Sequence, residues 1–115
     1  MGIIMQRGDI VICAQNGDYG KPRPAVIVQS DLFNEKHDSI TICPLTTHVI
    51  ETPLFRLLLS PNKNNGLKQT SQIMVDKITS LKRDKIHQKI GALTADQINK
   101  LNDAILLWLD LKNKN

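Results

Sequence analysis

Short runs of β-branched and aliphatic residues alternate with polar segments through the first two thirds of the chain. Runs of this kind, bounded by glycine, proline and asparagine, predict β-strands. The predicted strands span residues 9–14, 25–30, 40–45, 54–59 and 71–78. Short strands joined by irregular loops are typical of a small, strongly bent antiparallel sheet or barrel.

The last part of the chain has helical periodicity instead. Thr94 and Gln97 have the spacing of a capping box, and Leu93 and Ile98 stand where a hydrophobic staple forms. Apolar residues then recur at helical spacing at Ile98, Leu101, Ile105, Trp108 and Leu109. This pattern predicts a helix over 95–111, and a shorter helical turn is expected within 80–86. The broad apolar face of the long helix needs a groove or a partner, which suggests a homodimer.

The fold class predicted from these elements is mostly β with a C-terminal helix (α+β), in a single domain over residues 1–115. No apolar run approaches the roughly 20 residues that span a bilayer, and no secretory signal is recognisable at the start. We therefore expect a cytoplasmic protein. Cys13 and Cys43 lack CxxC spacing, so packed thiols are expected rather than a disulfide or a zinc site.

The net charge of +4 is unevenly distributed. Residues 1–55 carry a net charge of −2, whereas residues 56–89 carry +6. A basic segment favours binding of a polyanion, because each phosphate that it neutralises releases counterions. A solvated lysine-rich face is the alternative explanation. The low aromatic content of 3% argues against a platform of rings that stacks successive bases.

The segment Gly20-Lys-Pro-Arg-Pro24 is the most unusual local feature. Pro22 fixes its own φ, and Pro24 excludes Arg23 from the α region, so Arg23 is expected to be extended at the start of a strand. An arginine with a restricted backbone loses less entropy when it binds an anion, and its planar fork matches phosphate. The alternative is a loop whose prolines only protect a sheet edge.

A second polar segment is Cys43-Pro-Leu-Thr-Thr-His48. Pro44 within a β run predicts an edge strand or a bulge. The hydroxyls of Thr46 and Thr47 suit a phosphate oxygen, although a structural role at a strand end is the more common one.

Four motifs occur together in the order seen in the MazF/PemK family of toxins from type II toxin–antitoxin modules, and the chain resembles that family over residues 6 to 111. The motifs are Arg7-Gly-Asp-Ile-Val11, Tyr19-Gly-Lys-Pro-Arg-Pro-Ala-Val-Ile-Val28, Pro44-Leu-Thr-Thr47 and Gln72-Ile-Met-Val-Asp-Lys-Ile78.

The resemblance implies an SH3-like barrel of the CcdB/MazF/PemK type. It implies sequence-specific cleavage of single-stranded RNA by an endoribonuclease that uses neither a metal nor a cofactor. It also implies a cognate antitoxin as partner. The family's catalytic pair corresponds to Arg23 and Thr46, and the acid that some members use falls at Asp76.

Metal-free RNA cleavage uses the substrate's own 2′-hydroxyl as nucleophile, so the enzyme supplies charge stabilisation and proton transfer. Arg23 is expected to stabilise the transition state. Proton donation to the leaving oxygen is the alternative, which the weak acidity of a guanidinium disfavours. Asp76 is expected to orient Arg23, to act as base, or to form a plain salt bridge. Some relatives carry a histidine in the loop before the arginine, and this chain lacks it. His48 is the candidate substitute, because an imidazole suits proton transfer near neutral pH. The alternative is a solvent-exposed loop histidine.

RNA contacts are expected at Lys21, Thr47, Lys77 and Arg56. Lys77 stands where the family often has glutamine, so it is expected to change base preference or a phosphate contact. The recognised RNA sequence is expected to depend on the loops at 15–22 and 47–53.

Two alternatives belong to other functional classes. One is a non-enzymatic poison that binds DNA gyrase, as the fold relatives of the CcdB type do. The other is a plain nucleic-acid-binding barrel, for which the basic segment 56–89 would matter and Arg23 would not. The Gly-Lys-Pro-Arg-Pro segment favours the enzyme, because a gyrase poison needs no anion clamp.

Overall fold

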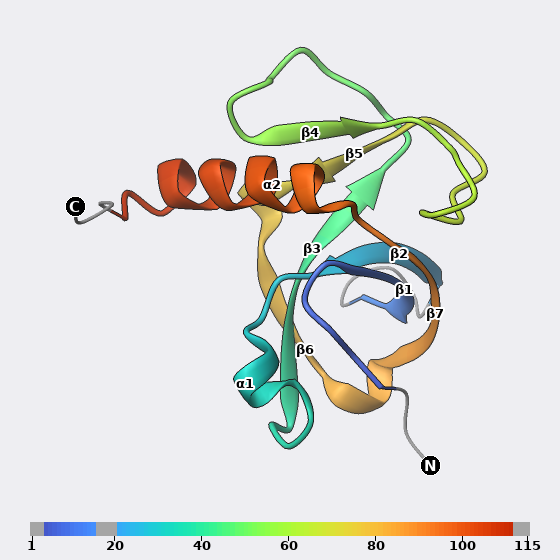
Figure 1. Ribbon diagram of the computed structural model, residues 1–115. Helices are drawn as coiled ribbons and strands as arrows, with labels where there is room; N and C mark the ends of the chain where they lie inside the picture. The colour runs from blue at the N-terminus through green and yellow to red at the C-terminus, as the bar shows by residue number, and fades with distance from the viewer. Residues whose placement is uncertain (1–3, 16–20, 112–115) are drawn as a thin grey trace.

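The computed structural model describes residues 4–15 and 21–111. Antiparallel pairing joins its strands in the order β4-β5-β3-β2-β1-β7, and β6 also pairs with β3. The elements are β1 (Asp9–Ala14), β2 (Pro22–Ile27), α1 (Asp31–Asn34), β3 (Ser39–Thr46), β4 (Arg56–Leu59), β5 (Ser71–Met74), the 3₁₀ turn η1 (Val75–Lys77), β6 (Thr79–Lys82), the 3₁₀ turn η2 (Arg83–Lys85), β7 (Ile86–Ala92) and α2 (Ala95–Trp108). Figure 1 shows that the sheet curls into an open, barrel-like form, with α2 lying beside β4 and β5. The predicted class, mostly β with a C-terminal helix, is confirmed.

Successive residues of the central strands point to two different apolar clusters. Ile10, Val26 and Cys43 belong to the cluster that includes residues of α2, whereas their chain neighbours Val11 and Ile27 belong to the second cluster. Side chains of a strand alternate between the two faces of a sheet, so a strand buried on both faces is apolar at every position. This explains why β1 and β2 contain continuous runs of β-branched residues.

Both cysteines are buried free thiols, as predicted. Cys13 lies in one cluster and Cys43 in the other, on opposite faces of the sheet. Burial raises the pKa of Cys43 to about 12 and also raises the pKa of Cys13. Thiols with a raised pKa are poor nucleophiles and metal ligands, so these side chains act as packing groups.

Pro44 was expected on an edge strand or at a bulge, and this prediction is wrong. It lies within β3, which has β2 on one side and both β5 and β6 on the other. On that second side β6 pairs with residues up to Ile42, and β5 pairs from Leu45 onward. Pro44 therefore stands where β3 changes partner, a position at which a missing N–H costs no ladder hydrogen bond.

Several element boundaries also differ from those predicted. β4 begins only at Arg56, because the amides of Phe55 and Arg56 both donate to the Thr52 carbonyl and form a turn. The run at 71–78 is interrupted by η1, after which the chain continues as β6. The helical turn expected within 80–86 is limited to η2, and neither α1 nor β7 was predicted.

The capping box of α2 is confirmed. The Thr94 amide donates to Gln97 Oε1 at 2.9 Å, and the Gln97 amide donates to Thr94 Oγ1 at 3.2 Å. The helix ends at Trp108 rather than at 111, and Asp110 has a left-handed φ of 56°. Within the described ranges, no helix has the length and apolarity needed to cross a membrane.

Candidate active site

Arg23 and Thr46 lie on neighbouring strands at the open end of the sheet. The β2–β3 ladder pairs Ala25 with Pro44, and the same register continued beyond the ladder sets Arg23 opposite Thr46. Opposed residues of an antiparallel pair project their side chains on the same face. The predicted extended conformation of Arg23 is confirmed, because it lies within β2 between Pro22 and Pro24, and its side chain is exposed.

A cavity of about 280 Å³ brings these two side chains together. The loop 15–22 was expected to shape RNA recognition, but its residues 16–20 lie outside the described part of the chain. The cavity is lined by Gln15, Arg23, Pro24, Leu45, Thr46, Thr47, Ser71 and Met74. The expected catalytic pair and one expected RNA contact, Thr47, therefore share one hollow.

The Thr46 hydroxyl is oriented by the turn that follows it. The His48 amide donates to Thr46 Oγ1 at 3.1 Å. A hydroxyl has one hydrogen and two lone pairs, so an oxygen that accepts this bond can still donate its hydrogen. Thr46 thus combines the structural role common at strand ends with a donor available to a phosphate oxygen.

Gln72, which begins one of the family motifs but had no expected role, holds the loop that follows Thr46. This buried side chain stands opposite Thr46 on β5. Its Oε1 accepts from the Ile50 amide at 3.0 Å, and its Nε2 donates to the Ile50 carbonyl at 2.7 Å. A glutamine inside an apolar strand was the available signal, because a buried amide needs hydrogen-bond partners.

Asp76 binds Arg56 and does not line the Arg23 cavity. Arg56 Nε donates to Asp76 Oδ1 and Arg56 Nη2 donates to Asp76 Oδ2, both at 3.1 Å. The side chains are only 9% and 17% exposed. Burial raises the pKa of Asp76, but the hydrogen bonds and charge of Arg56 outweigh it and leave this pKa below its usual range. The plain salt bridge that was one of the alternatives for Asp76 is therefore present. It engages the guanidinium of Arg56, which was expected to contact RNA.

The other expected site residues lie outside the cavity. The side chains of His48, Lys21 and Lys77 are exposed, and none of them is among the residues that line the hollow around Arg23. Lys21 precedes β2, and Lys77 is the last residue of η1.

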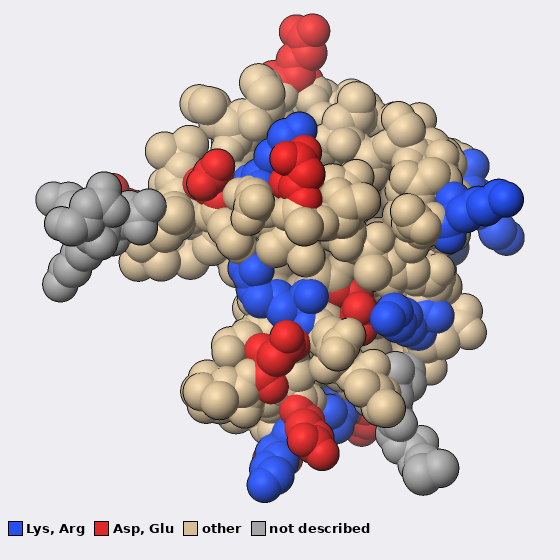
Figure 2. Space-filling view, viewed as in Figure 1, with Lys and Arg blue, Asp and Glu red and all other residues tan. Residues whose placement is uncertain are grey.

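Three cations of the basic segment 56–89 are engaged by acids or by backbone carbonyls. Besides the Arg56–Asp76 pair, Lys89 Nζ lies 3.2 Å from Asp9 Oδ1. Arg83 donates to the backbone carbonyls of Asn34 and His37 and holds the loop between α1 and β3. Figure 2 shows basic side chains interspersed with acidic ones on the face in view.

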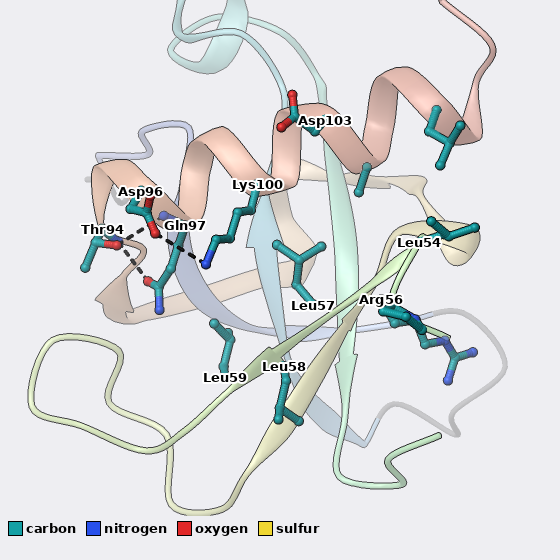
Figure 3. A pocket seen from close by; sticks show the side chains of 13 residues that line it. Leu54, Arg56, Leu57, Leu58, Leu59, Thr94, Asp96, Gln97, Lys100 and Asp103 are labelled. Carbon is teal, nitrogen blue, oxygen red and sulfur yellow. Dashed lines mark hydrogen bonds and ion pairs between the residues drawn. The ribbon is translucent and has the colours of Figure 1, made fainter. Parts of the chain in front are cut away.

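A second hollow of about 670 Å³ separates β4 from α2. Figure 3 shows Leu57 and Leu59 on β4 and Lys100 on α2 directed into the space between the two elements, with the capping box at one end. Lys100 pairs with Asp96 at 3.4 Å, one turn earlier in the helix. This groove is lined by leucines and by side chains of both charges, and neither Arg23 nor Thr46 is among its lining residues.

Comparison with known proteins identifies the family to which this architecture belongs. The model for PemK-like, MazF-like toxins of type II toxin–antitoxin systems matches residues 6–109. A probable endoribonuclease MazF from Mycolicibacterium smegmatis is 36% identical over 108 residues, covering 93% of this chain and 98% of its own.

Solved structures have the same fold. An endoribonuclease from a mycobacterial species, in complex with its cognate antitoxin, has a TM-score of 0.80 at 24% identity, covering 96% of this chain and 99% of its own. A MazE–MazF complex from Deinococcus radiodurans has a TM-score of 0.77 at 18% identity, with coverage of 96% and 99%. The chain is thus a member of the PemK-like, MazF-like toxins of type II toxin–antitoxin systems.

Proposed function

We propose that this chain, acting as a single domain over residues 1–115, is an endoribonuclease toxin that cleaves single-stranded RNA in the cytoplasm without a metal. The observation that carries the proposal is the placement of Arg23 and Thr46 opposite each other in one cavity. An RNase assay in EDTA tests it directly. A gyrase poison or a plain nucleic-acid-binding barrel would leave the RNA uncut.

The reaction that suits these groups is transphosphorylation. The 2′-oxygen of a ribose attacks the adjacent phosphorus, the bond from phosphorus to the 5′-oxygen breaks, and a 2′,3′-cyclic phosphate and a 5′-hydroxyl form. Negative charge grows on the non-bridging oxygens in the transition state. The Arg23 guanidinium and the Thr46 hydroxyl are donors that stabilise such charge when held in place before the reaction.

One proton must leave the 2′-hydroxyl, and one must reach the 5′-oxygen. Both carboxylate oxygens of Asp76 accept hydrogen bonds from Arg56, so we assign Asp76 to the fold and not to this step. We assign proton transfer to His48, because its amide is bound to Thr46 and imidazole suits proton transfer near neutral pH. The test compares how the rate of RNA cleavage varies with pH in the wild type and in the His48→Ala variant. The variant should lose the pH dependence that the wild type shows.

Removing the Thr46 hydroxyl is expected to slow cleavage about a hundredfold, the typical effect of losing one donor to a developing oxyanion. Thr46→Val keeps the shape of the side chain and removes its hydrogen-bonding group. Thr46→Ser keeps the hydroxyl, together with the bond from the His48 amide, and is expected to retain most activity. Single-turnover cleavage of a short RNA measures both variants, and a wild-type rate for Thr46→Val would exclude the role.

RNA contacts beyond the reacting phosphate extend around this cavity. Thr47 lines it beside Thr46, and Lys21 lies just before β2, where it can meet a neighbouring phosphate. Lys77 is exposed on η1 and is proposed to contact the RNA farther along. Arg56 is proposed to act indirectly, because its pairing with Asp76 joins β4 to η1.

An apolar patch at the end of α2 supports the proposed homodimer. Leu107, Leu109 and Leu111 are about half exposed. Phe55 packs against Trp108 with ring centroids 5.2 Å apart, which connects the patch to the loop before β4. Contiguous exposed apolar side chains of this kind mark an interface between proteins.

Charges placed in this patch are expected to produce a monomer. The double variant Leu107→Glu, Leu109→Glu buries two carboxylates of each protomer if the dimer forms through α2, which costs several kcal/mol. The matched control is Leu32→Glu, since Leu32 is 82% exposed on α1. Sedimentation at micromolar concentration should show a monomer for the double variant and a dimer for the control. A dimer in both would place the interface elsewhere.

The second partner is the cognate antitoxin, as in the antitoxin-bound mycobacterial relative. We propose that a disordered, acidic antitoxin segment occupies the RNA cavity and becomes ordered on binding. Competition between the antitoxin and a short RNA for the toxin tests this assignment, because two ligands of one cavity cannot bind at the same time.

A further inference from the structure

A third hollow, of about 350 Å³, adjoins the Arg23 cavity and is here called the base slot. The two hollows share three lining residues, Pro24, Thr47 and Ser71. They therefore form one continuous path around the end of the sheet. An RNA whose phosphate lies between Arg23 and Thr46 would have an adjacent nucleotide beside this slot.

Both aliphatic and polar side chains line the base slot. Ile12, Leu67 and Ile90 contribute aliphatic surface. The side-chain amides of Gln69 and Gln88 also belong to the lining, and both residues are exposed. Gln88 stands opposite Ile12 across the β1–β7 ladder, so its position is set by the sheet.

The loop that forms one wall of the slot is held rigidly before any ligand binds. Asn65 is 1% exposed, and its Oδ1 accepts from the amides of Asn62 and Leu67. Its Nδ2 donates to the Ser60 carbonyl. The Ala92 amide donates to the Asn64 carbonyl and fastens the loop to β7. A preformed pocket binds with a smaller loss of entropy than one that must become ordered.

This combination of surfaces suits a nucleobase. Proteins read single-stranded RNA by splaying bases out of the stack, packing their faces and binding their polar edges. An amide offers a donor and an acceptor side by side, which matches the edge of a base. Lys68 also lines the slot and supplies a positive charge for the backbone of the same nucleotide.

We propose that the base slot binds the nucleobase next to the cleaved phosphate, and that Gln69 and Gln88 read its edge. This inference rests on the proposed RNA cleavage and names the part of the chain that sets one position of the recognised sequence. It places specificity on the β4–β5 loop and β7, in addition to the loops at 15–22 and 47–53.

Cleavage mapping on a long, defined RNA tests the inference. Gln69→Ala, Gln88→Ala and the double variant are compared with the wild type in EDTA. Preference at one nucleotide beside the cut should relax about tenfold to hundredfold, the discrimination provided by one good amide–base pair. Lys63→Ala is the matched control, because Lys63 is exposed on the same loop and does not line the slot. It should keep the wild-type preference.

Two outcomes overturn the inference and can be told apart. If all three glutamine variants cut the same sites with the same preference as the wild type, the slot does not read a base, although RNA cleavage stands. If the wild type itself cuts no RNA, the proposed function and the inference both fail. Circular dichroism confirms that each variant is folded before its sites are mapped.

Discussion

Replacing Arg23 by alanine is expected to lower the rate of RNA cleavage by about a hundredfold to a thousandfold, the range found when a preorganised donor to a transition-state oxyanion is removed. Arg23 carries its charge into the cavity that also contains the Thr46 hydroxyl. Both neighbours of Arg23 are prolines, which restrict the backbone whatever side chain lies between them. The fold should therefore survive the substitution, and an unchanged thermal melt would establish this.

Two further variants separate the guanidinium from mere positive charge. Arg23→Lys keeps the charge but loses the planar fork, so its rate should lie between those of the wild type and Arg23→Ala. Lys85→Ala removes one charge from an exposed position that does not line the cavity, and it should cleave normally. Wild-type single-turnover rates for Arg23→Ala would refute the proposed mechanism. An equal loss in Lys85→Ala would show that only the net charge matters.

The residues of this site could be selected from the sequence, but their arrangement could not. Restricted backbone and side-chain chemistry single out Arg23 and Thr46, whereas their opposition depends on the β2–β3 register. The partner of Asp76 shows the same limit. Arg56 lies 20 positions away and meets Asp76 only because the β4–β5 ladder pairs Arg56 with Met74.

The strand β7 was missed by the sequence patterns because its apolar signal is weak. β7 begins with the buried Ile86 and continues with the exposed side chains of His87, Gln88 and Lys89. It is joined to β1 by backbone pairing, which leaves no pattern in the side chains. By contrast, the capping box of α2 is local in sequence, so its geometry could be predicted from Thr94 and Gln97 alone.

Gly66→Ala is expected to cause the largest loss of stability among single substitutions in the base slot, at least about 3 kcal/mol in the free energy of unfolding. Gly66 has a φ of +66°, which favours glycine. A Cβ there would lie 2.2 Å from the carbonyl oxygen and 2.9 Å from the carbonyl carbon of Ile90. These are backbone atoms of β7, and Ile90 lies between Lys89 and Gly91, which both pair with β1, so they cannot move away without disturbing these pairings.

Gly8→Ala provides the control that separates this collision from backbone strain. Gly8 also has a positive φ, of +93°, but a Cβ there would meet the end of the Ile98 side chain, Cδ1, at 2.8 Å. A side-chain terminus can rotate, so the loss in Gly8→Ala should be about 1–2 kcal/mol, mainly from strain. Urea unfolding followed by circular dichroism gives both values. Equal losses in the two variants would mean that the β4–β5 loop can move away from Ile90 of β7 to make room for the methyl group. A slot with such a movable wall would discriminate poorly between bases.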